Sequence, residues 1–576
     1  MYQHTVSAPK ANHERAEASA AGWFRARRLV WDVAIPLLIF IAAWLPRYAL
    51  IHSLDLVTDE GVYIPIGIHD VRLLQAGAIT SHAWLVNYEA PAFPKLLIGL
   101  GALTVGPLLG PQGWLVGARL PGVLLATLTL VAAYFLARGI VGRGGAALGA
   151  LALAVSPWLA FYGAIAYLDG YMLCFATLAV LLAWHAARRP WLWPLVGVLG
   201  GLAFASKYTA AFIAAPILLY LAVRGLAVTR RLPPWQALLM PLVGLLTVYL
   251  VDPAIWVSPL SRFWHSVMFE YHHAAHGHEV FWAGSVWRHV PPGMGLYIAL
   301  AKLSLFITVP AALGLAWGLW RVARALLTRQ RFTPLDERAA FLVAWLGGLA
   351  PLFASLTIIV GTHYVLPLAP PLAFTAGWAW MRAVRWLAPR LTPRAQAVLA
   401  ALRGRVSGRP RLAARLALEP PHVRRGVTLA LAALVAIAML APTTFGLLTI
   451  PQAEGYTAEW LPGENTSLQV AYPAYADAVN WVVAHSSGRT TVTLVMSDRG
   501  ALDEWMSTRQ TLFPSRIRLV VGTPLSFAKS EYIIWPEHLV QRQFPQPLGF
   551  NHLIVARITG GGTTYCYILL WPHPNR

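Results

Sequence analysis

Two adjacent carboxylates, Asp59 and Glu60, follow the first apolar stretch of this chain. Acidic residues are scarce, since Asp and Glu together number 24 among 576 residues. A carboxylate at the edge of a membrane span is costly to remove from water, so an acidic pair there favours a chemical role. That role would be proton transfer, because a carboxylate can accept or orient the proton of a hydroxyl or amine. The alternative is a solvated pair of acids in a loop.

Further charged and polar residues lie inside apolar stretches or at their ends. A charge within a span is by default a functional hypothesis. For each Lys or Arg, the alternative is that the long side chain reaches out to the interface. Asp169 is too short for that, and its alternative is a structural pairing with a nearby Lys or Arg. The members of this group are Arg47, Lys95, Arg119, Asp169, Lys207, Lys302 and His363.

Acids and bases gathered at one membrane face suit one kind of reaction. The acceptor needs a carboxylate, and a phosphate-bearing donor needs Lys and Arg to hold the phosphate as it leaves. A donor anchored in lipid would enter this site from the bilayer. The combination favours glycosyl transfer from a polyprenyl phosphate sugar, although these residues do not define the sugar.

The composition is that of a polytopic membrane protein. Hydrophobic residues make up 57% of the chain and charged residues 12%, whereas soluble domains are about one quarter charged. The mean hydropathy is +0.56. The net charge of +21 comes from arginines clustered in short loops between apolar stretches, which is the positive-inside pattern rather than a nucleic-acid surface. The two cysteines, Cys174 and Cys566, imply no disulfide framework.

The apolar stretches predict eleven spans with the N-terminus in the cytoplasm. This orientation puts every arginine-rich loop on the cytoplasmic side, including a loop from Arg382 to Arg425 with eleven arginines and one Glu. If the apolar segment 94–110 crossed the membrane, every later arginine-rich loop would lie on the outer side. We therefore expect this segment to be interfacial or re-entrant. The spans are 30–50, 114–137, 145–162, 165–187, 191–207, 209–228, 236–257, 296–320, 339–360, 364–386 and 426–449.

The predicted fold is mainly α: a helical membrane domain of about eleven spans and a small C-terminal extracytoplasmic α/β domain. Alternating apolar residues predict strands in the last part of the chain, and Tyr475–His485 reads as a helix. The predicted divisions are a basic tail at 1–28, the membrane domain at 29–450 with outer loops 51–113 and 258–295, and the C-terminal domain at 451–576. The predicted strands are Thr490–Met496, Ile517–Val521, Tyr532–Trp535, His552–Ile558 and Tyr565–Trp571.

Six motifs in order over about residues 30–370 resemble the GT-C glycosyltransferases, in particular the protein O-mannosyltransferases and the lipid A aminoarabinose transferases. The chain departs from the family pattern at Val62 and His363, where arginine is common in these relatives, and at Ala90 and Ala92. The motifs are the acidic pair Asp59-Glu60, the stretch Asn87 to Gly101, Ala118-Arg119-Leu120-Pro121, Tyr167-Leu168-Asp169, Gly201 to Tyr208, and His363-Tyr364-Val365-Leu366-Pro367.

The resemblance implies an inverting transferase that uses a polyprenyl-phosphate sugar, without a metal or other cofactor. It implies Asp59 as the base and Glu60 as its support. The donor phosphate or substrate would be bound by Lys95, Lys207, Arg47, His363, Tyr63 and His278. Arg119, Asp169, Glu89 and Lys302 would support these residues. The implied partners are the lipid-linked donor and the bilayer of the cell membrane, with an acceptor that stays open.

Three other features have competing interpretations. The His-rich segment from Tyr271 to His278 either binds a metal, since imidazole suits zinc, or covers the donor together with neighbouring aromatic residues. Asn465-Thr466-Ser467 matches a glycosylation sequon, which occurs often by chance. For the whole protein, the alternatives are a transporter or flippase of lipid-linked intermediates and a non-catalytic envelope scaffold. A transporter usually has repeat symmetry, which the sequence lacks.

Overall fold

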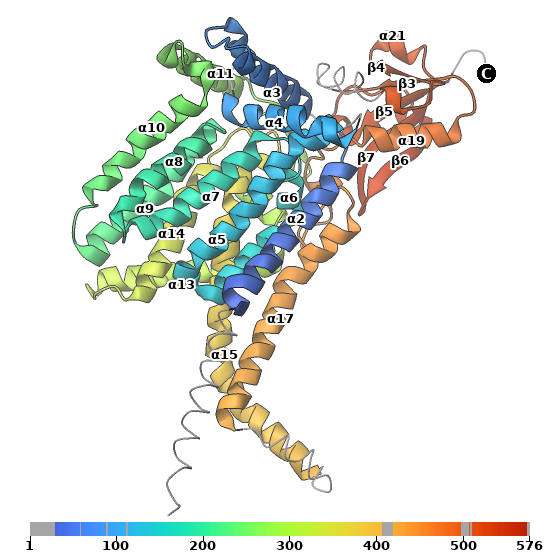
Figure 1. Ribbon diagram of the computed structural model, residues 1–576. Helices are drawn as coiled ribbons and strands as arrows, with labels where there is room; N and C mark the ends of the chain where they lie inside the picture. The colour runs from blue at the N-terminus through green and yellow to red at the C-terminus, as the bar shows by residue number, and fades with distance from the viewer. Residues whose placement is uncertain are drawn as a thin grey trace, which may run out of the picture.

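The computed structural model describes residues 29–57, 59–87, 90–110, 113–405, 419–496, 506 and 510–572. Within these residues, seven helices are long and apolar enough to cross a membrane. The chain is therefore a multi-pass membrane protein with a helical bundle and a small C-terminal sheet (Figure 1). The seven segments are Val30–Ser53, Gly113–Ala154, Leu168–Ala186, Tyr208–Thr229, Leu305–Leu327, Pro334–Ala354 and Pro420–Thr449.

The main helices follow the apolar stretches of the sequence. Three further apolar segments are shorter, at Ala92–Thr104, Pro190–Phe204 and Trp235–Val251, so the expected count of eleven spans stays a prediction. The helices are α2 (Ile35–Ser53), α3 (Glu60–Gln75), α4 (Ala92–Thr104), α5 (Gly113–Ala154), α6 (Pro157–Tyr162), α7 (Leu168–Ala186), α8 (Trp193–Phe204), α9 (Ala214–Val223), α10 (Leu239–Val251), α11 (Pro259–His276), α12 (Met294–Ala301), α13 (Leu305–Leu327), α14 (Pro334–Ala354), α15 (Ala369–Arg405) and α17 (Pro420–Thr449).

Helix α5 is the centre of the bundle, and it packs against α2, α4, α7 and α15. It breaks at Gly142, whose φ of 78° is in a region that glycine adopts at little cost. This break separates the two spans expected at 114–137 and 145–162. Its second half crosses α15 closely, since a Cβ on Gly377 would lie 2.3 Å from the carbonyl oxygen of Gly145. Small residues permit such close approach between membrane helices.

Helix α15 corrects one expectation. The arginine-rich segment beginning at Arg382 was expected to be a loop, but α15 continues without a break to Arg405. Its last turns are rich in Ala, Leu and Arg, which are strong helix formers. A run of arginines therefore does not exclude a helix.

One end of the bundle carries α3, α4, α11 and the C-terminal sheet, whereas α15 and α17 extend beyond the opposite end (Figure 1). Helix α4 lies across its end of the bundle. Its 13 residues span about 20 Å, which is shorter than the hydrocarbon core of a bilayer. This agrees with the interfacial segment expected at 94–110.

The C-terminal part contains a five-stranded sheet in the order β4-β3-β5-β7-β6. Strand β3 pairs in parallel with β4 and β5, while β7 pairs antiparallel with β5 and β6. All five predicted strands form, with ends shifted by a few residues, and the predicted helix is α19. The bounds are α19 (Tyr475–His485), β3 (Thr490–Leu494), β4 (Ile517–Val521), α21 (Pro524–Phe527), β5 (Tyr532–Pro536), β6 (Ile554–Gly560) and β7 (Thr563–Leu570), and a separate hairpin joins β1 (Val280–Trp282) to β2 (Ser285–Trp287).

Candidate functional site

The two adjacent acids have different environments. Glu60 begins α3 and is fully buried, and its carboxylate forms an ion pair with the guanidinium of Arg119 at 2.6 Å. It also accepts hydrogen bonds from the backbone N–H groups of Val57 and Ala166. Arg119 donates its remaining hydrogens to the carbonyl oxygens of Leu54, Asp55 and Ile51. The ion pair between Glu60 and Arg119 connects the loop before α3 to α5. Glu60 therefore has a structural role.

Asp59 is half-buried in the turn that precedes α3. Its backbone N–H donates to the hydroxyl of Tyr167 at 3.2 Å. The ring of Tyr167 meets that of Tyr63 edge-on, with centroids 6.1 Å apart. Asp59 therefore lies beside two tyrosines, one from α3 and one from the turn before α7.

His363 lies among three tyrosine rings. Its ring centroid is 5.6 Å from that of Tyr167, 5.5 Å from that of Tyr162 and 4.9 Å from that of Tyr364. The missing side chain of Gly361 makes room for it, since a Cβ there would lie 2.6 Å from the imidazole. Burial and the charge of Lys207 lower the pKa of His363 to about 4, against the opposing charge of Asp169. The imidazole is therefore neutral near pH 7.

Lys207 supplies the positive charge of this group. Its ammonium forms an ion pair with Asp169 at 2.8 Å and lies 4.6 Å from the ring centroid of Tyr364. Asp59 is near enough for its charge to act on Lys207. Contacts thus run from Asp59 through Tyr167, His363 and Tyr364 to Lys207. We call this set, together with Tyr63 and Asp169, the acid–lysine cluster.

Lys95 belongs to a second group, between α3 and α4. Its buried ammonium donates to the carbonyl oxygens of Asn87 and Ala90, each at 2.9 Å. The charges of Asp70 and Asp252 also act on it, and both acids are buried. Burial raises the pKa of Asp70 to about 7, because the effect of Lys95 only partly offsets it.

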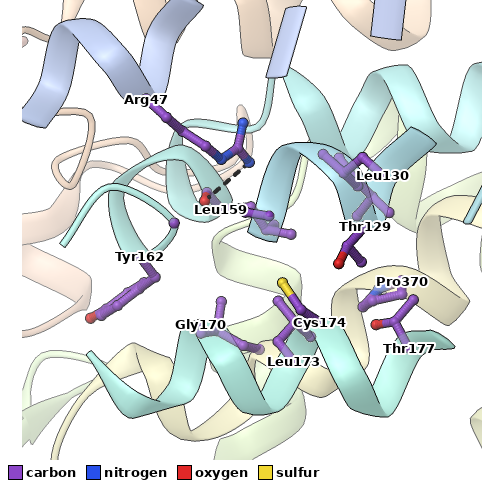
Figure 2. A pocket seen from close by; sticks show the side chains of 14 residues that line it. Arg47, Thr129, Leu130, Leu159, Tyr162, Gly170, Leu173, Cys174, Thr177 and Pro370 are labelled. Atoms are coloured by element: carbon purple, nitrogen blue, oxygen red, sulfur yellow. Dashed lines mark hydrogen bonds between the residues drawn. The ribbon is translucent and has the colours of Figure 1, made fainter. Parts of the chain in front are cut away.

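Arg47 lies deeper in the bundle and is almost fully buried. It donates to the carbonyl oxygens of Ala43, Ala154 and Leu159, and so joins α2 to α5 and α6. It lines a cavity of about 40 Å³ whose walls are mostly apolar side chains (Figure 2). Tyr162, which contacts His363, forms another part of the cavity wall. Arg47 is thus connected to the acid–lysine cluster through Tyr162.

The remaining predicted residues lie elsewhere. Lys302 is buried at the end of α12 and pairs with Glu464 of the C-terminal part at 2.6 Å. His278 is half-buried between α11 and β1. Glu89 lies outside the described residues. Among the residues that the structure does describe, no group of three or more His, Cys, Asp and Glu could hold a metal ion.

Sequence reasoning missed three tyrosines of this site as candidates. Tyr167 and Tyr364 belong to motifs that were singled out, those of Asp169 and His363, and Tyr162 lies five residues before Tyr167. Aromatic residues are common in membrane proteins, so residue type carried no signal. Their closeness in sequence to Asp169 and His363 could have identified Tyr167 and Tyr364 as candidates.

Comparisons with known proteins agree with the arrangement of helices. Residues 108–252 match the family described as dolichyl-phosphate-mannose-protein mannosyltransferase. The fold resembles the crystal structure of the oligosaccharyltransferase of Archaeoglobus fulgidus in the apo form, with 12% identity and a TM-score of 0.51, over 88% of this chain and 70% of that one. This chain has a GT-C fold.

A second GT-C structure has a similar length. It is ArnT from Cupriavidus metallidurans bound to undecaprenyl phosphate, with 18% identity and a TM-score of 0.47, over 94% of this chain and 98% of that chain. A search of the curated proteins found no match. The resemblance to the mannosyltransferases that the motifs suggested is supported by the family match over residues 108–252.

Proposed function

We propose that this protein is a glycosyltransferase that moves a sugar from a polyprenyl-phosphate donor to an acceptor at the outer face of the membrane. The observation that carries the proposal is the acid–lysine cluster, in which a half-buried carboxylate and a lysine lie within reach of each other's charge. A proton acceptor and a phosphate-binding cation are the two groups that such a transfer needs. The GT-C fold and the mannosyltransferase match support the donor class.

Asp59 is the proposed base. It takes the proton of an acceptor hydroxyl or amine as the acceptor's oxygen or nitrogen attacks the anomeric carbon of the sugar. The bond between that carbon and the phosphate oxygen breaks, and one displacement inverts the configuration at the anomeric carbon. Glu60 supports Asp59 indirectly, because its ion pair with Arg119 fixes the start of α3.

Lys207 is the proposed partner of the leaving phosphate. An ammonium in a water-poor site stabilises the charge that develops on the departing phosphate oxygen. Asp169 orients this ammonium through the ion pair at 2.8 Å. Tyr63 and the neutral His363 both contact Tyr167, whose hydroxyl accepts the backbone N–H of Asp59. Their polar atoms are suited to the sugar hydroxyls, which need hydrogen bonds rather than charge.

The other predicted donor residues have less direct roles in this proposal. The ammonium of Lys95 is held by carbonyl groups between α3 and α4, so it would reach a phosphate only through the loop that it supports. Arg47 lines the apolar cavity together with Tyr162. Lys302 joins the membrane part to the C-terminal part. For orientation we retain a cytoplasmic N-terminus and an extracytoplasmic C-terminal domain, which the arginine distribution supports.

The test is turnover of the purified full-length protein in detergent with a panel of polyprenyl-phosphate sugars and acceptors from its own envelope. Release of the lipid phosphate with transfer of the sugar, and inversion at the anomeric carbon of the product, is the expected result. A retained configuration would contradict direct displacement. No turnover on any donor would contradict the proposal and favour a transporter or a scaffold.

A further inference from the structure

The loop that carries the acidic pair is held from two sides. On one side, Arg119 of α5 donates to the carbonyl oxygens of Leu54 and Asp55, at 2.8 and 2.7 Å. On the other side, the C-terminal part of the chain contacts the same loop more than 400 residues later in sequence. The polar residue at the centre of both sets of contacts is Asp55, which is buried.

Asp55 binds the C-terminal part with both its backbone and its side chain. Its N–H donates to the hydroxyl of Tyr472 at 2.9 Å. Its carboxylate accepts the N–H of Ala476, in the first turn of α19, at 2.9 Å. A carboxylate at the start of a helix also interacts favourably with the helix dipole. The other carboxylate oxygen accepts the N–H of Leu56, which fixes the turn toward Asp59.

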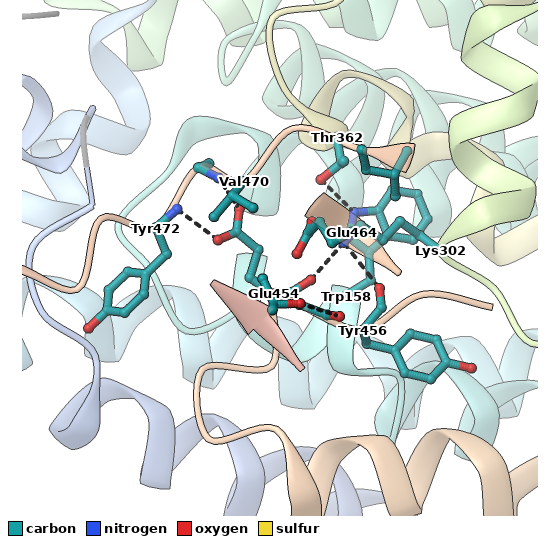
Figure 3. Close-up of polar contacts among 12 residues, drawn as sticks. Trp158, Lys302, Thr362, Glu454, Tyr456, Glu464, Val470 and Tyr472 are labelled. Carbon is teal, nitrogen blue, oxygen red and sulfur yellow. Dashed lines mark hydrogen bonds and ion pairs between the residues drawn. The ribbon is translucent and has the colours of Figure 1, made fainter. Parts of the chain in front are cut away.

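Tyr472 is itself held in place by buried charged groups (Figure 3). Its N–H donates to the carboxylate of Glu454 at 2.7 Å. The carbonyl oxygen of Glu454 accepts from the ammonium of Lys302 at 2.6 Å, and Lys302 also pairs with Glu464. Lys302 ends α12 of the membrane part. The contact at Asp55 is thus one end of a buried chain of hydrogen bonds that begins in the bundle.

Buried groups of this kind leave little room for alternative arrangements. A buried donor or acceptor that loses its partner is left unsatisfied, which is unfavourable. Residues 54–56 therefore take their conformation from the C-terminal part as well as from Arg119. Asp59 lies three residues beyond Leu56, within the same loop.

We propose that the C-terminal part acts as a positioning element for the acid–lysine cluster, with Tyr472 and Asp55 as its positioning residues. Neither residue touches the reacting groups. Both act by fixing the backbone that presents Asp59 to the acceptor. This inference rests on the proposed function for its catalytic consequence, whereas the fixing of the loop can be measured without turnover.

The test compares Tyr472→Phe with the wild type in the full-length protein. The change removes only the hydroxyl that accepts from the N–H of Asp55. The matched control is Tyr567→Phe, because the hydroxyl of Tyr567 in β7 makes a hydrogen bond with Glu537, also in the C-terminal part. Hydrogen exchange is followed in peptides that cover residues 54–60, and kcat and the donor KM are measured in parallel.

The expected result for Tyr472→Phe is exchange about tenfold faster in loop 54–60, with kcat lower by roughly 5- to 30-fold and a donor KM within twofold of wild type. The control is expected to leave both the exchange and kcat unchanged. Asp55→Asn keeps one acceptor oxygen where the carboxylate has two. It is also expected to speed exchange in the loop and to lower kcat, and it replaces Tyr472→Phe in the test if that variant does not fold.

Unchanged exchange in the loop would overturn the positioning role. An equal loss of kcat in the control would overturn it too, because the effect would then be general destabilisation. Faster exchange with unchanged kcat would show that the conformation of the loop does not limit catalysis, and would overturn the proposed catalytic consequence. If the wild type itself transfers no sugar while exchange responds as expected, the proposed function fails and the fixing of the loop stands.

Discussion

Replacement of Glu60 by Gln tests how the two adjacent acids divide their roles. Glu60 is fully buried and accepts hydrogen bonds from the N–H groups of Val57 and Ala166 and from two nitrogens of Arg119. Gln keeps the shape but has one oxygen and an N–H₂ group. The amide would turn a donor toward another donor and leave the guanidinium of Arg119 without a counter-charge.

Breaking a buried ion pair by removing one partner costs about 3–5 kcal/mol, because an uncompensated charge stays buried. We therefore expect Glu60→Gln to lower the free energy of unfolding by about that amount, measured by reversible unfolding in mixed detergent micelles. The control is Glu419→Gln, since the side chain of Glu419 is 78% exposed and surface changes stay within about 0.5 kcal/mol.

A double-mutant cycle with Arg119→Met makes the expectation sharper. Removing both charges is expected to cost less than the sum of the single changes, by at least about 2 kcal/mol. The reasoning is refuted if Glu60→Gln costs less than about 1 kcal/mol. It is also refuted if the double variant equals the sum of the two singles.

Three further outcomes follow from the structure. Lys207→Gln is expected to lower the rate of lipid phosphate release by about 10²- to 10³-fold, and a rate near that of wild type would exclude Lys207 from the reaction. The pKa of Asp70 is raised to about 7 in the folded state, so the folded protein binds a proton that the unfolded chain releases above about pH 4. The apparent Tm should therefore fall as pH rises from 4 to 7, and Asp70→Asn should make this fall shallower. The same dependence of Tm on pH in the wild type and in Asp70→Asn would contradict the raised pKa of Asp70. Gly99→Ala would place a Cβ 2.0 Å from the carbonyl oxygen of Gly67, so it should lower the free energy of unfolding by about 1–3 kcal/mol, and with it the apparent Tm. Gly347→Ala is the control, because its Cβ would meet open space in α14, and it should not lower the apparent Tm.

Local patterns in the sequence predicted the elements of the fold well. The strand Ile517–Val521 and the helix Tyr475–His485 form with the predicted bounds, because alternation and helical periodicity are local signals. The break at Gly142 also followed from two apolar stretches separated by Gly and Arg. The continuation of α15 through the arginine segment did not, because charge reports the side of the membrane and not helicity.

Pairings between distant residues were beyond the sequence. The partner of Lys302 is Glu464, 162 positions away, and the partner of Asp55 is Tyr472. The motifs placed Asp59, Asp169, Lys207 and His363 at one end of their helices, and the structure brings these four together. Nothing local separated them from Lys95 and Arg47, which are also polar residues near the ends of apolar stretches. That separation depends on helix packing.

The most direct test of the account is turnover by wild type and Asp59→Asn under identical conditions with an active donor. Asn keeps the shape of Asp59 but cannot accept a proton. The account predicts a loss of at least about 10²-fold in sugar transfer, with donor affinity and apparent Tm close to those of wild type. Equal turnover by the two proteins would contradict it, because the acid at the centre of the cluster would then have no part in the reaction.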